Sequence, residues 1–171
     1  GRAELVKLHL MSDENGDAPI TKLNDWEGEV VKHEIARDGA LAWYRNPQRQ
    51  TADSLGIAYR DETTGNWRSM HPDFVFFHEV DGQAKASIVD PHGHHLDDSL
   101  VKLQALATFA EEHGASFHRI EALSKVGDVM KKLNLKDDAV RAGIKAGGQT
   151  VDWFYNSDLA INYYAEETMG S

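Results

Sequence analysis

Residues 71–95, HPDFVFFHEVDGQAKASIVDPHGHH, form the stretch that most constrains the fold of this chain. Two apolar runs flank Asp81-Gly82, a typical two-residue β-hairpin turn. Asp73 precedes the first run and Asp90 follows the second. The pattern therefore predicts one β-hairpin with an aspartate at the outer end of each strand.

Pairing across this turn predicts that the two aspartates meet. If Val80 pairs with Gln83, antiparallel register places Asp73 directly opposite Asp90 on the same face of the sheet. Opposed side chains have Cβ atoms roughly 5 Å apart, so two carboxylates there repel each other. A divalent cation or a shared proton would offset the repulsion, and the alternative is that both side chains face water. Alternation by two residues adds His92 to the face of Asp90.

Length and composition predict one domain without a membrane span. The chain has 171 residues, 41% hydrophobic, and no apolar run approaches the roughly 20 residues that a membrane helix needs. The N-terminus does not resemble a secretory signal and cysteine is absent, so we expect a cytoplasmic protein. A formal net charge of −10 argues against a free-standing nucleic-acid binder that relies on a broad basic patch.

Hydrophobic periodicity predicts a single α/β domain with helices on both sides of the hairpin in sequence. Residues 1–21 are expected to form a strand end and a polar loop, and residues 147–171 a helical C-terminal appendage. The remaining helices are predicted at 23–36, 97–113, 126–133 and 137–145, and the remaining strands at 41–44, 55–59 and 116–122.

Several of these residues resemble the PD-(D/E)xK nuclease superfamily, the restriction-endonuclease-like fold. Pro72-Asp73 matches the first half of the motif, and Asp90-Pro91-His92 matches the second half except for its last residue. Glu27, in Trp26-Glu27, resembles the glutamate of the family's first helix, and Lys102 falls where the helix after the motif often carries a lysine. Further agreement comes from the aromatic stretch Trp43-Tyr44-Arg45-Asn46, from Tyr59 and from Gly93.

The resemblance implies a fold and a position within a larger protein. The expected core, over residues 22–146, is a mixed sheet of about four strands flanked by helices in the order αβββαβ. The likeness is closest to the C-terminal nuclease domain of type III restriction enzymes and related helicase subunits. A helicase or ATPase region of the same parent protein is therefore an expected partner, together with DNA.

The implied activity is metal-dependent hydrolysis of DNA phosphodiester bonds by an endonuclease. By the resemblance, Glu27, Asp73 and Asp90 would hold Mg²⁺ or Mn²⁺, and the carbonyl oxygen of Pro91 would add a ligand. Such a metal lowers the pKa of a bound water and neutralises charge on the phosphate.

His92 stands where the family has its lysine. A histidine can act as a base or a metal ligand, but it cannot copy the flexible ammonium group. Three explanations follow: His92 has taken over the role, Lys102 reaches back into the site from the helix, or catalysis has been lost. In the last case the domain is a pseudonuclease that serves as a DNA-docking or protein-interaction module.

Overall fold

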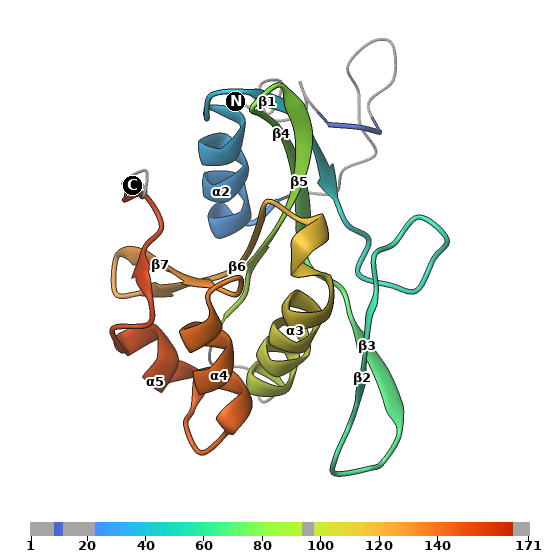
Figure 1. Ribbon diagram of the computed structural model, residues 1–171, viewed down its shortest axis with the longest axis vertical. Coiled ribbons are helices and arrows are strands. Elements are labelled where there is room, and N and C mark those ends of the chain that lie inside the picture. Colours follow the sequence, from blue (N-terminus) through green and yellow to red (C-terminus); the bar gives the residue numbers. More distant parts are fainter. Residues whose placement is uncertain (1–8, 12–22, 94–97, 166–171) are drawn as a thin grey trace.

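The computed structural model describes residues 9–11, 23–93 and 98–165 (Figure 1). Its helices are α2 (Asp25–Ile35), α3 (Ser99–His113), α4 (Asp138–Ala146) and α5 (Val151–Asn156), with a 3₁₀ turn at Gly114–Ser116. The first strands are β1 (Ala40–Arg45), β2 (Ile57–Arg60), β3 (Trp67–Met70) and β4 (Phe74–Val80). The later strands are β5 (Gln83–Pro91), β6 (Arg119–Val126), β7 (Val129–Asn134) and β8 (Ile161–Asn162).

Six of the strands form one mixed sheet, in the order β1-β4-β5-β6-β7-β8. Among the strands β1 to β8 of the described residues, only β5 and β6 pair in parallel, and α3 lies between them in sequence as the crossover connection. The other two strands, β2 and β3, pair with each other as a separate antiparallel hairpin that projects beside α3 (Figure 1).

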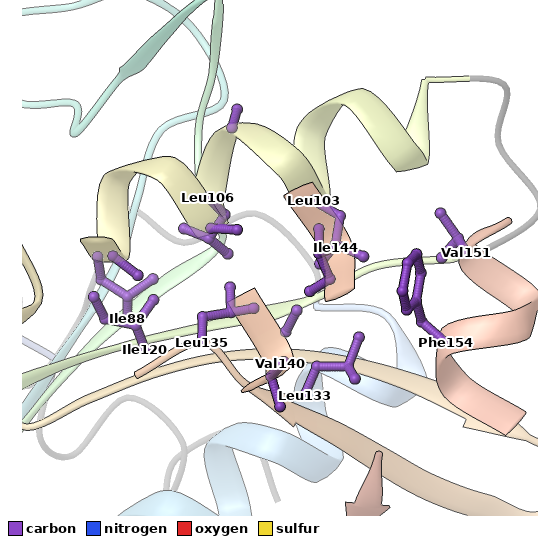
Figure 2. Close-up of a cluster of buried hydrophobic side chains, with 14 of the residues drawn as sticks. Ile88, Leu103, Leu106, Ile120, Leu133, Leu135, Val140, Ile144, Val151 and Phe154 are labelled. Carbon is purple, nitrogen blue, oxygen red and sulfur yellow. The ribbon is translucent and has the colours of Figure 1, made fainter. Parts of the chain in front are cut away.

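One face of the sheet packs against α3, α4 and α5. Ile88, Ile120 and Leu133 point from three neighbouring strands into this apolar cluster (Figure 2). The helices supply, among others, Leu103, Leu106, Val140, Ile144 and Phe154. Ile57 and Met70 of the separate hairpin join the same cluster, so they attach β2 and β3 to the domain.

The opposite face of the sheet is covered by α2. Val30 and Val31 of α2 pack against a cluster that includes Trp43, Phe74 and Val89. Asn24 begins the helix, because its side chain accepts a hydrogen bond from the Glu27 amide while the Glu27 carboxylate accepts one from the Asn24 amide.

Buried charged groups tie α2 to the sheet. The guanidinium of Arg119 on β6 donates to both carboxylate oxygens of Glu34 on α2, at 2.9 and 2.6 Å, and to Glu121 at 2.8 Å. Lys132 on β7 lies 3.4 Å from Glu121, and the hydroxyl of Tyr163 donates to Glu34. All five side chains are almost fully buried.

The α/β class predicted from the sequence is confirmed, but two details are wrong. Within the described ranges the sheet has six strands where about four were expected, because β7 and β8 extend it beyond β6. Residues 126–133, predicted as a helix, instead form the end of β6, a turn and most of β7, with Val126 paired to Val129.

The C-terminal part of the described chain belongs to the same core. Phe154 of α5 is in the cluster under α3, and β8 pairs with β7. The N-terminal strand and loop expected at 1–21 lie largely outside the described residues. None of the described helices combines the length and apolar character needed to cross a bilayer.

Candidate functional site

The β4–β5 hairpin brings Asp73 and Asp90 together as its register predicts. Pairing runs without a shift from Val80↔Gln83 to Phe74↔Val89, so the next residues outward are the two aspartates. The backbone amide of Asp73 donates a 2.9 Å hydrogen bond to Oδ1 of Asp90. The predicted register is therefore confirmed.

The two carboxyl groups strongly influence each other's ionisation. Burial, followed by the negative charge of Asp90, raises the pKa of Asp73 to about 8. Burial also raises the pKa of Asp90, against the lowering effects of the Asp73 amide, His92 and Lys102. At neutral pH the pair therefore retains at least one proton in the absence of a cation. The alternative in which both aspartates simply face water is wrong.

A cavity of about 130 Å³ opens onto this pair. It lies where β3, β4, β5 and α3 meet, so residues distant in sequence share its wall. The lining residues are Gln48, Ser69, Met70, His71, Asp73, Asp90, His92 and Lys102.

Lys102 lies on α3 at the edge of this cavity, as the explanation that it reaches back from the helix requires. Its ammonium group is 2.7 Å from the Asp98 carboxylate, one turn earlier on the helix. Its positive charge lowers the pKa of both Asp73 and Asp90. The carboxylate of Asp98 thus holds the positive charge of Lys102 beside Asp73 and Asp90.

His92 also lines the cavity, directly after β5. Its backbone amide donates a 2.9 Å hydrogen bond to the Leu123 carbonyl, which fixes the backbone at this point. Its Nε2 is buried and makes no hydrogen bond to any residue within the described ranges. The imidazole therefore offers one uncommitted nitrogen near Asp90.

The other two residues predicted as metal ligands are less available. Glu27 lies close enough for its charge to raise the pKa of Asp73. However, its Oε2 is 2.9 Å from the Arg45 guanidinium and also caps the start of α2. Pro91 is the buried last residue of β5, next to Asp90 and opposite Leu123 of β6.

The donor set fits Mg²⁺ better than zinc. Across the described ranges, no group of three or more His, Asp or Glu side chains is arranged to hold a metal. A structural zinc site needs about four protein ligands, whereas Mg²⁺ is usually bound by one or two carboxylates, substrate phosphates and water. The buried carboxyl group of Asp90 and the half-buried one of Asp73, both with raised pKa values, meet that smaller requirement.

Sequence reasoning did not identify His71 as part of the site. Ser54 donates its only hydroxyl hydrogen to the Pro47 carbonyl at 2.7 Å, so Nδ1 of His71, 2.8 Å away, donates to Ser54. In the neutral ring Nε2 is then an acceptor, and it lies 3.2 Å from Ser69 Oγ. Its position could have indicated this, because His71 precedes Asp73 by two residues and alternate residues of an extended chain share one face.

Comparison with known proteins places the chain in a family. The profile of the YagJ family matches residues 7–164. Protein YagJ of Escherichia coli strain K12 is 40% identical over 157 residues, which are 92% of this chain and 63% of that protein. The chain thus spans less than two thirds of this relative's length. No solved structure matches the chain, and neither family nor relative carries a name that states an activity.

Proposed function

This chain belongs to the YagJ family, and we propose that it is a metal-dependent DNA endonuclease with a restriction-endonuclease-like core. The proposal rests on one observation. Asp73 and Asp90 lie opposite each other at the ends of adjacent strands, and they share one cavity with Lys102. A buried and a half-buried carboxylate beside a lysine are suited to binding a metal and a phosphate.

Asp73 and Asp90 are the residues proposed to hold Mg²⁺ or Mn²⁺, with Pro91 contributing its carbonyl and Glu27 at the margin. When bound, the metal supplies an activated water and neutralises charge on the phosphate. The protein's own part is to hold the carboxylates. Pairing of β4 with β5 fixes their spacing, and the amide of Asp73 orients Oδ1 of Asp90.

Lys102 and His92 are proposed to handle the charge and the protons of the reaction. The ammonium of Lys102 lies beside the carboxylates and can neutralise a phosphate that enters the cavity. The uncommitted Nε2 of His92 can accept or donate a proton. We propose that the two residues together replace the single lysine of the nuclease motif.

The wider setting of the activity stays a prediction. DNA is the proposed substrate, and a helicase or ATPase region of a parent protein is the proposed partner. The cytoplasm is the proposed compartment.

One observation favours the alternative of a pseudonuclease. Glu27 is tied to Arg45 and to the cap of α2, so two rather than three acidic side chains are free to meet a cation in the described site. A domain of this kind would keep the fold as a DNA-docking or protein-interaction module.

Nicking of supercoiled plasmid in Mg²⁺ or Mn²⁺ tests both proposals. Asp73→Asn is expected to reduce the rate at least about 100-fold, because it removes a ligand. The matched control is Asp81→Asn, the same change at the turn of the same hairpin, where asparagine is also favoured. Wild type and control should nick equally. Nicking that survives Asp73→Asn would contradict the site assignment, and no nicking with either metal would favour the pseudonuclease.

A further inference from the structure

One face of the hairpin of β2 and β3 leads to the cavity that contains Asp73 and Asp90, which we call the carboxylate cavity. Ile57 and Met70 are paired and buried in the core under α3, so one face of the hairpin is used for packing. Residues of the other face alternate with them, and Arg60 pairs directly with Trp67 at its outer end. We call Arg60, Trp67 and Ser69 the outer face.

Trp67 is the most unusual residue of this face. Its side chain is 74% exposed, the largest value among the exposed apolar residues of the described chain. It also borders a hollow of about 720 Å³ between the hairpin and α3. A solvated indole beside a guanidinium presents a flat aromatic surface and a positive charge together. That combination suits a nucleic-acid base and its phosphate.

The outer face continues into the proposed active site. Ser69 follows Trp67 by one strand period, and its hydroxyl contacts the ring of His71. Ser69 and His71 both line the cavity that contains Asp73. At about 3.3 Å per residue, Trp67 lies at most roughly 20 Å along the chain from Asp73. A strand of nucleic acid laid along this face would therefore enter the cavity.

Charge on the hairpin does not oppose this path. Arg60 is exposed, and one nitrogen of its guanidinium donates to the Gly65 carbonyl. Two acids of the turn, Asp61 and Glu62, are balanced in number by Arg60 and Arg68, and Asp61 is paired with Arg68 at 3.2 Å. Because the whole chain carries a formal net charge of −10, binding by stacking has an advantage over binding by charge alone.

We propose that Trp67 stacks on an unpaired base of single-stranded DNA whose backbone runs past Arg60 to the carboxylate cavity. The inference rests on the proposed nuclease function and specifies its substrate as DNA with a single-stranded segment at the cleavage site. Bases of an intact duplex are already stacked on each other, so they offer no face to the indole.

Binding of a fluorescein-labelled oligothymidine, followed by anisotropy in EDTA, tests the inference apart from catalysis. All proteins carry Asp73→Asn, which prevents hydrolysis. Trp67→Ala is expected to weaken binding roughly 5- to 150-fold, the range for loss of one stacked base. Trp67→Phe should retain most of the affinity. Arg60→Gln should lower the slope of log K against log salt by about 0.7.

The matched control is Trp153→Ala on α5, which removes another exposed indole, 45% accessible, that does not line the cavity. It should leave oligothymidine binding unchanged, and Trp67→Ala should change binding of a blunt duplex less than twofold. The inference is overturned if oligothymidine does not bind, or if Trp67→Ala binds as the parent does. It is also overturned if both tryptophan variants lose affinity equally. If the protein with Asp73 intact does not cleave the oligothymidine in Mg²⁺ or Mn²⁺ while Trp67-dependent binding persists, the nuclease is overturned and the stacking site is kept.

Discussion

The backbone amide of Asp73 donates to Oδ1 of Asp90, so the two facing aspartates differ in their surroundings. The Asp90 carboxylate is anchored by the neighbouring strand, and burial raises the pKa of both carboxyl groups, that of Asp73 to about 8. The pair therefore has one fixed member and binds a proton or a cation. The raised pKa of Asp73 makes the site sensitive to pH near neutrality.

Stability of the metal-free protein should fall as pH rises from about 4 to about 8. The pKa of Asp73 is raised in the folded state, so over this window the folded protein holds a proton that the unfolded chain has released. Each unit by which the pKa is raised corresponds to about 1.4 kcal/mol of stability lost across the window. Urea unfolding at several pH values, in EDTA, measures the fall. Asp73→Asn should make the profile less steep and be more stable than wild type at pH 8, while the raised pKa of Asp90 keeps part of the slope. An unchanged slope in this variant would refute the assignment.

Affinity for Mg²⁺ or Mn²⁺ should change with pH in the opposite direction. A cation must displace the proton of Asp73, so the association constant should rise about tenfold per pH unit from pH 6 to pH 8 and then level off. Calorimetry in two buffers of different ionisation enthalpy would also detect the released proton. Binding that is strong and independent of pH would mean that the metal sits elsewhere.

Lys102 should matter more to cleavage than His92, because its charge acts on both aspartates. Lys102→Met is expected to lower the nicking rate about 100-fold or more, as loss of a charge-stabilising group commonly does. Lys145→Met removes a lysine that is likewise ion-paired with a helix carboxylate, that of Glu111, and it should leave the rate unchanged. If His92→Ala is instead the more damaging change, the histidine has taken over the role of the motif lysine.

The hairpin could be predicted because its signals are local. Asp81 and Gly82 both adopt positive φ, 52° and 76°, which two-residue turns of this kind require. The helix predicted at 126–133 was wrong because apolar residues at 126, 129, 130 and 133 also fit a helical period. Gly127 with φ of 60° allows a turn there, and pairing with β6 decides the outcome.

Contacts across long sequence separations could not be predicted in the same way. Hydrogen bonds with Ser54 and Ser69 hold the ring of His71 at the site, and neither serine belongs to a recognisable motif. The ion pair between Glu34 and Arg119 joins residues 85 positions apart. Such pairs depend on the packing of α2 on the sheet, which periodicity does not specify.

Removing Arg119 should destabilise the fold strongly. Burial alone would raise the pKa of Glu34, but hydrogen bonds and charge from Arg119 lower it to about 2. Arg119→Met leaves Glu34 and Glu121 buried without this partner, at a cost of about 3–5 kcal/mol. Arg37→Met removes a more exposed guanidinium 3.8 Å from the same Glu34 and should cost under about 1 kcal/mol. Urea unfolding at pH 7 compares the two variants. An equal loss of unfolding free energy in both would contradict the claim that burial makes the Arg119 ion pairs more important than that of Arg37.

Two glycines should respond in opposite directions to the same substitution. Gly39 precedes β1 with φ of 76°, and an added Cβ would lie 2.5 Å from the Glu79 carbonyl oxygen. Gly39→Ala should therefore cost about 2 kcal/mol or more. Gly28 lies inside α2 with no atom within 4 Å of its added Cβ, so Gly28→Ala should gain about 0.5–1 kcal/mol. Urea unfolding of both variants provides the measurement. A stabilising Gly39→Ala would contradict the close approach of this loop to β4.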